Sequence, residues 1–303
     1  PLLGWEGRRL GVIQLDCLRP GQAFRPDDLE LLTAVCLQAS IVVENAALHV
    51  EQLREARLKQ ELQTAREIQQ AFLPAEFEPL GAEGPDLYAC VHPAREMSGD
   101  LYDFFPLPDG RLAFFLGDVS GKGMPAALFM IAVRTLIRHL APAATSPADL
   151  LKRLNTALVA NNPTNLYVTM AHGVYDPRDG RTVIATGGHP KPLHRRADGQ
   201  VAPLPTPPSL MIGCAPVEPV YADVTLTLQP GETLILYSDG YTEAFCQDRT
   251  QMFGMEGLSE AVGGPRTQLS LQRCAEETAA AVARFTGGGD LQDDQTLLLL
   301  RRR

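Results

Sequence analysis

The spacing of apolar residues predicts one long helix near the start of the chain. Residues 27–72 contain neither glycine nor proline, and Pro26 suits a first helical turn. The first part of this segment carries a broad apolar stripe at helical spacing, made of Leu29, Leu32, Val35, Leu37, Ile41 and Val42. Residues 11–16, before the helix, alternate like a half-buried strand.

The second part of the helix has the spacing of a coiled coil. Charges of both signs fill residues 45–72, while apolar or small residues recur at steps of three and four. The seam runs through Val43, Ala47 and Val50 and then through Leu58, Leu62, Ala65 and Phe72, with Gln69 filling one position. The two stretches are one residue out of phase near Leu53, so the seam must shift there. We expect a parallel homodimer; the alternative is a single helix packed on its own domain.

Beyond a proline- and glycine-rich linker that starts at Pro74, short apolar segments replace the helical pattern. Strands are expected at 88–92, 112–116, 167–175, 182–186, 224–228, 233–237 and 296–300, and helices at 125–140, 147–160 and 266–285. Ser146 and Asp149 have capping-box spacing at the start of the second helix. Many strands with few strand-helix-strand units favour an α+β fold: an antiparallel β-sandwich flanked by helices, with the long helix or coiled coil in front.

Composition and charge exclude several classes of protein. A content of 45% hydrophobic residues argues against intrinsic disorder. The formal net charge of -9 argues against binding nucleic acid through its phosphates. We expect no membrane span, because the longest candidate, residues 126–133, stops at Arg134. No apolar segment follows the first charges as it would in a signal peptide, and the six cysteines are widely spaced, so a cytoplasmic location is expected.

Acidic residues gather in four clusters, mostly beside glycine, at residues 98–100, 117–123, 238–240 and 290–296. Asp118 and Asp239 each follow a strongly apolar strand, which would hold the carboxylate at a sheet edge. Convergent carboxylates repel one another unless cations neutralise them, and hard oxygen ligands suit magnesium or manganese. Residues 117–123 are not a phosphate-binding loop, because the glycine spacing is short by one and Gly123 replaces the hydroxyl residue.

The order of these clusters along the chain, and the residues in each, resemble the motifs of the SpoIIE/RsbU-like branch of the metal-dependent (PPM-type) serine/threonine protein phosphatases. The motifs are Ser98-Gly-Asp-Leu-Tyr-Asp-Phe104, Gly117-Asp-Val-Ser-Gly-Lys-Gly-Met-Pro-Ala-Ala127, Gly187-Gly-His189, Leu236-Tyr-Ser-Asp-Gly-Tyr-Thr-Glu243 and Asp293-Asp-Gln-Thr296. The resemblance extends from about Ala65 to the C-terminus. Residues 1–48 resemble the last part of a GAF sensor domain. The expected organisation is therefore a GAF-like fragment at 1–48, a coiled-coil linker at 49–74 and a phosphatase domain at 75–303.

The resemblance implies a centre of two or more Mn²⁺ or Mg²⁺ ions and assigns its ligands by motif position. Asp118 would bridge the ions, the Val119 carbonyl would ligate one, and Asp100 would bind or orient the first. Asp239 and Asp293 would complete the other site, with Asp294 the alternative to Asp293. Asp118 and Asp239 are the expected catalytic residues. Arg95 would contact the substrate phosphate. His189 would lie at the rim, or be a satisfied turn histidine.

The implied activity is hydrolysis of phosphoserine or phosphothreonine on a partner protein, in bacterial signalling. The resemblance suggests an anti-sigma-factor antagonist as that partner, and regulation through the N-terminal sensor and helix. One alternative is a scaffold or pseudophosphatase that signals through the GAF-like region and coiled coil. Another is a different two-metal hydrolase such as a nucleotide phosphodiesterase, against which the lack of a His-Asp metal cluster speaks.

Overall fold

The computed structural model describes residues 1–4, 7–16, 23–74, 84–95, 97–160, 162–214, 219–264 and 269–303. Its contacts divide the chain into two units, Pro1–Thr64 and Ala65–Arg303. Part of the linker expected after Pro74, residues 75–83, lies outside the described residues. The GAF-like and coiled-coil assignments stay predictions.

The long helix is confirmed as α1, Pro26–Phe72. Before it, β1 (Leu2–Leu3) and β2 (Arg9–Gly11) pair antiparallel. The strand expected at residues 11–16 is wrong beyond Gly11, because 12–16 form no regular structure. Val12 is 79% exposed, so its alternating pattern has no second apolar surface to pack on.

Among the residues that the structure describes, two helices, α1 and the segment Met124–Ala143, are long and apolar enough to cross a membrane by length and composition alone. The apolar face of the second is instead buried in the protein, through Ala126, Met130, Val133 and Ile137. Burial against a sheet explains its composition without a lipid environment.

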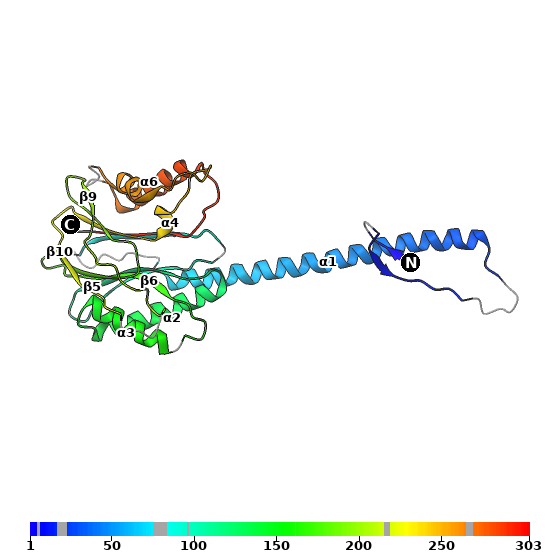
Figure 1. Ribbon diagram of the computed structural model, residues 1–303, viewed down its shortest axis with the longest axis horizontal. Coiled ribbons are helices and arrows are strands. Elements are labelled where there is room, and N and C mark those ends of the chain that lie inside the picture. Colours follow the sequence, from blue (N-terminus) through cyan, green and yellow to red (C-terminus); the bar gives the residue numbers. More distant parts are fainter. Residues whose placement is uncertain are drawn as a thin grey trace. The chain divides into compact units, whose positions relative to one another are not determined.

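Two five-stranded antiparallel sheets form the second unit (Figure 1). The first has the order β10-β7-β6-β5-β4, with β4 Asp100–Pro106, β5 Leu112–Val119, β6 Val168–Tyr175, β7 Arg181–Gly187 and β10 Val224–Thr227. The second has the order β3-β12-β11-β8-β9, with β3 Asp86–His92, β8 Leu193–Arg195, β9 Val201–Pro203, β11 Thr233–Tyr237 and β12 Gln295–Arg301.

Helices cover the outer face of each sheet (Figure 1). The first sheet carries α2 (Met124–Leu140), the short helix η2 (Ala141–Ala143) and α3 (Pro147–Ala160). The second carries α4 (Asp239–Thr242), α5 (Gly254–Val262) and α6 (Leu271–Thr286). Three apolar clusters result, one between the two sheets and one under each helical layer. The antiparallel β-sandwich flanked by helices is therefore confirmed.

Alternation along β5 shows how the sequence builds these layers. Leu112, Phe114 and Leu116 point into the cluster between the sheets, whereas Ala113 and Phe115 point toward α2 and α3. Both faces of β5 are buried, so the segment is apolar at nearly every position.

Strand β4 was not among the expected strands, because acids interrupt its apolar pattern. Asp103 is fully buried, and its carboxylate pairs with two arginines of α2. Arg138 donates to it at 2.6 and 2.8 Å, and the Arg134 Nε lies 2.9 Å away. A charged residue that is paired in this way can occupy a buried position at which a sequence pattern predicts an apolar residue.

Candidate active site

Asp100 and Asp118 face each other at one edge of the first sheet. Asp100 opens β4, Asp118 is the next-to-last residue of β5, and the two are direct partners across the antiparallel pair. Asp100 is only 1% exposed, and Thr296 Oγ1 donates a hydrogen bond of 2.5 Å to its Oδ2. The two acids that the sequence analysis took from separate motifs are therefore adjacent in space.

The other acids come from the second sheet. Asp239 opens α4 directly after β11, and Asp293 precedes β12, which pairs with β11. Ser238 joins the two segments, because its Oγ donates to the Asp294 carbonyl at 3.1 Å and accepts from the Thr296 amide at 2.8 Å. Thr296 then reaches across to Asp100, so that one hydrogen-bonded chain links both sheets at this edge.

Asp293 and Asp294 differ sharply in what their carboxylates do. Asp294 accepts the backbone N–H of Ala94 at 2.8 Å and that of Gly99 at 2.9 Å, one on each oxygen. Asp293 takes the Asp294 amide on Oδ1, and its Oδ2 lies 3.6 Å from Lys122 Nζ. Because backbone donors occupy both oxygens of Asp294, whereas Asp293 faces only one backbone amide and an exposed lysine side chain, Asp293 is better suited to bind a cation.

Burial and mutual repulsion raise the pKa values of these acids. Burial, followed by the charges of Asp239 and Asp293, raises the pKa of Asp118 to about 7. The pKa of Asp100 is raised well above its ordinary value, first by burial and then by Asp118. Burial and the neighbouring Glu243 raise that of Asp239. Each shift therefore reflects first the burial of the carboxylate and then the negative charges beside it.

This donor set fits hard divalent cations. Within the described segments, no three His, Cys, Asp or Glu side chains are already grouped as ligands of one ion. The acids nevertheless supply only oxygen, several are shielded from water, and they repel one another in the absence of a cation. Magnesium or manganese would relieve that repulsion, whereas a thiol- or imidazole-seeking ion would find no matching ligands among these residues.

Two glycines keep the site compact. A Cβ added to Gly99 would lie 2.8 Å from the Val119 carbonyl oxygen, the atom assigned to a metal by motif position. A Cβ added to Gly240 would collide with the Asp294 carbonyl, closer than real Cβ atoms approach any neighbour. The segment that begins at Asp239 and the segment that contains Asp293 and Asp294 therefore pack too closely for any side chain at position 240.

The other expected residues lie in different surroundings. Arg95 is exposed, and its side chain makes no hydrogen bond or ion pair to the residues that the structure describes. His189 is 9% exposed, and its Nδ1 lies 2.8 Å from Thr169 Oγ1. Burial lowers the pKa of His189 to about 3, so its imidazole is neutral.

Sequence reasoning assigned no role to Thr296, Ser238 or Lys122, although all three are within the quoted motifs. Their signal was position alone: a hydroxyl after the Asp-Asp pair, a serine before Asp239 and a lysine four residues after Asp118. Only the pairing of β11 with β12, and of β4 with β5, brings these groups to the carboxylates.

A stability measurement in chelator would test the raised pKa of Asp118. Between about pH 4 and pH 7 the unfolded Asp118 is ionised while the folded one keeps its proton, so its contribution to stability falls as pH rises. In chelator, Asp118→Asn should therefore melt above the wild type at pH 8, by roughly 3 °C or more, and this gap should close by pH 5. Buried histidines affect both proteins equally and cancel in the difference. A gap that is constant with pH would contradict the assignment.

Comparison with known proteins gives the chain a family. The model of the family "Stage II sporulation protein E (SpoIIE)" matches residues 108–303. Protein IcfG of Synechocystis sp. is 31% identical in an alignment of 244 residues that covers 71% of this chain and 37% of IcfG. RsbU of Bacillus subtilis, named a phosphoserine phosphatase, is 26% identical over 250 residues, which are 82% of this chain and 72% of RsbU. The chain thus spans little more than a third of IcfG and most of RsbU.

The fold agrees with this assignment. The SiaA-PP2C domain of Pseudomonas aeruginosa superposes with a TM-score of 0.70 at 22% identity, covering 82% of this chain and 98% of that domain. At such low identity the likeness concerns the fold, which is the PP2C sandwich of two sheets between helices. With the family model and the phosphatase relative in agreement, the chain belongs to the SpoIIE family and contains a metal-dependent serine/threonine phosphatase domain.

Proposed function

We propose that this protein removes phosphate from phosphoserine or phosphothreonine on a partner protein. The observation that carries the proposal is the pairing of the buried Asp100 with the partly buried Asp118, close to the charges of Asp239 and Asp293 at one edge of the two sheets. Such a concentration of carboxylate charge suits cations better than it suits a substrate phosphate, which the acids alone would repel.

The residues have distinct roles in this proposal. Asp118 and Asp239 lie centrally and are the catalytic carboxylates, with Asp100, Asp293 and the Val119 carbonyl as further ligands. Two or more Mn²⁺ or Mg²⁺ ions bound there would activate water and neutralise the phosphoryl oxygens. Asp294 acts on the protein instead, by holding the Ala94 and Gly99 amides and so shaping the loop before Asp100.

Arg95 is the proposed contact for the substrate phosphate. It lies in that same loop, one residue after Ala94, whose amide Asp294 binds. Its guanidinium is exposed and could pair with two phosphoryl oxygens at once.

The substrate is proposed to be a phosphorylated anti-sigma-factor antagonist in the cytoplasm. The relative RsbU bears the name phosphoserine phosphatase, which supports a phosphoprotein substrate. A net charge of -9 makes nucleic acid an unsuitable partner.

Phosphate release from p-nitrophenyl phosphate and from a panel of phosphoproteins tests this function. We expect turnover that needs Mn²⁺ or Mg²⁺, disappears in chelator and returns when the metal is restored. A metal-loaded, folded protein without turnover on any of these substrates would favour the scaffold or pseudophosphatase interpretation. Turnover of phosphodiesters but not of phosphomonoesters would point to a different two-metal hydrolase.

Regulation through α1 is the second part of the proposal. Gln69, near the end of α1, is only 3% exposed. Its Nε2 donates to the Ser98 carbonyl at 2.6 Å, and its Oε1 accepts from the Ser98 amide at 3.3 Å. Ser98 is two residues before Asp100, and its Oγ accepts from the Asp100 amide. A movement of this end of α1 would therefore displace Ser98 and, through it, Asp100, the proposed first metal ligand.

Gln69 also modifies the expected coiled-coil seam. It was assigned to the seam between helices, but its amide is bonded to the chain's own catalytic unit. Earlier in α1, Val43, Val50 and Leu58 are each at least 45% exposed. We propose that the part of α1 that contains these residues forms a parallel homodimer, because an apolar stripe on a solvated helix needs a partner.

Charge placed in the seam tests the dimer. Leu58→Glu combined with Leu62→Glu should give a monomer in sedimentation, since four like charges would meet across the interface. Phosphatase activity should change several-fold, while circular dichroism shows an intact fold. The matched control, Gln52→Glu with Gln60→Glu, adds the same charge outside the seam and should stay dimeric. A double seam variant that remains dimeric, or becomes monomeric with unchanged activity, would refute the coupling.

A further inference from the structure

A cavity of about 260 Å³ lies on the helix-covered face of the first sheet, at the end away from the acids. Arg111, which precedes β5, and Arg181, which opens β7, lie at this end, whereas Asp118 lies at the other end of β5. The start of α3 closes one side through Thr145, Ser146 and Pro147. The cavity is therefore separate from the candidate active site.

His172 of β6 lines this cavity and lacks the contacts that a buried imidazole needs. The residue is 2% exposed, and neither ring nitrogen has a hydrogen-bond partner in the described part of the chain. One face of its ring stacks on Phe115, with 6.5 Å between ring centroids. Burial lowers the pKa of His172 to about 3, so the ring is neutral and offers one donor and one acceptor. Two unsatisfied polar atoms of this kind cost free energy unless something in the cavity bonds them.

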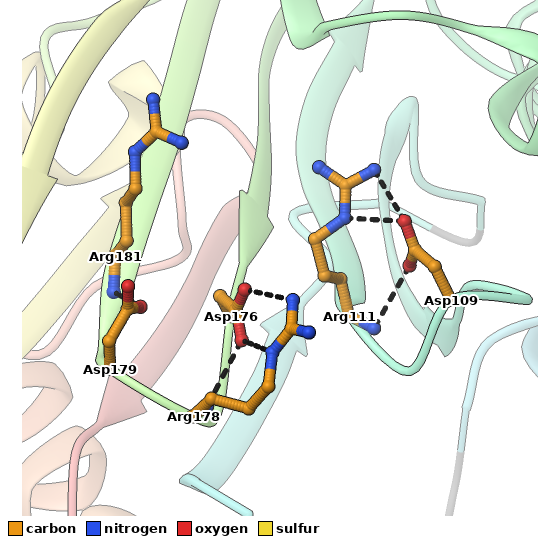
Figure 2. Close-up of polar contacts among 6 residues, drawn as sticks. All are labelled: Asp109, Arg111, Asp176, Arg178, Asp179 and Arg181. Carbon is orange, nitrogen blue, oxygen red and sulfur yellow. Dashed lines mark hydrogen bonds and ion pairs between the residues drawn. The ribbon is translucent and has the colours of Figure 1, made fainter.

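Arg181 supplies an uncommitted positive charge to the same cavity. Figure 2 shows the three arginines near this edge, with Arg178 bound by both oxygens of Asp176 and Arg111 paired with Asp109. The Arg181 guanidinium has no such partner among the described residues, because Asp179 accepts only its backbone N–H.

Asp223 is the acid among the residues that line the cavity, and its Oδ1 accepts the Ala148 amide, at the start of α3, at 2.9 Å. It forms no ion pair with Arg181 in the described part of the chain. Arg181 is therefore the cation left for a ligand.

The positions of these groups define the shape of a ligand. Val174 is the strand partner of Val183, and His172 is the partner of Ala185, so His172 lies deeper along the strands than Arg181. Ala185 lies four positions after Arg181 in β7, roughly 13 Å along the strand. Apolar side chains lie between, among them Ala113, Val174 and Val183.

We propose that this cavity binds a small organic acid, with its carboxylate on Arg181, an apolar middle and an uncharged hydroxyl or carbonyl group on His172. The site differs from the phosphatase centre in position and in chemistry, and it requires no metal.

Three related probes test each part of the proposal on the full chain in chelator, where the metal centre cannot bind carboxylates. They are 3-(4-hydroxyphenyl)propionate, 3-phenylpropionate without the hydroxyl, and 3-(4-hydroxyphenyl)propionamide without the charge. We expect saturable binding of the first by ligand-observed NMR, and binding about fivefold or more weaker for each of the other two.

Variants assign the binding to the cavity. Arg181→Gln should weaken the two acids about fivefold and leave the amide unchanged. Its control, Arg178→Gln, changes the same charge outside the cavity and should bind like the wild type. His172→Phe keeps the ring packing, and it should weaken the hydroxyl-bearing acid about tenfold while leaving 3-phenylpropionate unchanged.

Specific results would overturn the proposal. No saturable binding up to about 10 mM would show that the cavity holds no such ligand. Equal binding of the acid and the amide would remove Arg181 from the site. Binding that neither Arg181→Gln nor His172→Phe alters would lie elsewhere on the protein.

Discussion

Asp118→Asn should lower metal-dependent phosphate release by about a hundredfold or more in kcat/KM, because the site loses the charge on which the proposed cations depend. Asp118 lies opposite Asp100, and its pKa is raised first by burial and then by repulsion from Asp239 and Asp293. Asparagine keeps the size of the side chain but not its charge. Asp239→Asn should have an effect of the same order.

Control measurements separate loss of chemistry from loss of fold. Asp179→Asn, in the exposed turn after β6 and thus at the end of that strand away from Asp118, removes one carboxylate and should leave kcat/KM unchanged. Manganese titration by calorimetry should show weaker or fewer sites in Asp118→Asn than in the wild type. Near-wild-type, metal-dependent turnover by either Asp118→Asn or Asp239→Asn would disprove the assignment of the catalytic carboxylates.

Among substitutions of glycine by alanine, we expect Gly240→Ala to be the most damaging. The added methyl group would collide with the Asp294 carbonyl. The backbone segment that carries Asp239 would therefore have to move away from the segment that carries Asp293. Overpacking of this kind costs about 1–3 kcal/mol of folding free energy. We expect a lower melting temperature and phosphate release reduced about tenfold or more, since a small misplacement of catalytic groups has a large kinetic effect.

Gly289→Ala is the matched control for this change. Gly289 precedes the same acidic loop, and a Cβ added there would meet nothing within 4 Å. Its melting temperature and activity should stay close to the wild type. If Gly240→Ala were as stable and as active as Gly289→Ala, the close approach of the two loops would not matter for the site.

The sequence predicted those elements in which apolar alternation and burial agree. Strands β6 and β11 and helices α2 and α3 lie within one residue of the expected ranges, and β5 begins as expected at Leu112 but continues three residues further, to Val119. Two deviations have physical causes. Strand β4 was not expected because its buried Asp103, which pairs with two arginines, interrupts the apolar pattern. Residues 12–16 form no strand because their alternating side chains have no surface to pack on. Helix α6 was expected from residue 266 and begins at Leu271, while residues 265–268 lie outside the described residues.

The site was predictable as a set of motifs but not as a network. Spacing after apolar strands indicated Asp118 and Asp239, and motif order indicated Asp100 and the Asp293-Asp294 pair. Nothing in a linear pattern distinguishes two adjacent acids, because their difference depends on which backbone amides each one meets after folding. The link from Gln69 to Ser98 joins residues 29 positions apart, and helical periodicity alone assigned Gln69 to a different interface.

Anomalous scattering at the manganese edge, from crystals grown with Mn²⁺, tests the central claim most directly. The account predicts at least two manganese peaks per chain between Asp100, Asp118, Asp239 and Asp293, with the Val119 carbonyl as a further ligand and Asp294 still bonded to the Ala94 and Gly99 amides. Manganese peaks elsewhere, or none at saturating metal in a protein that is active with manganese, would contradict it.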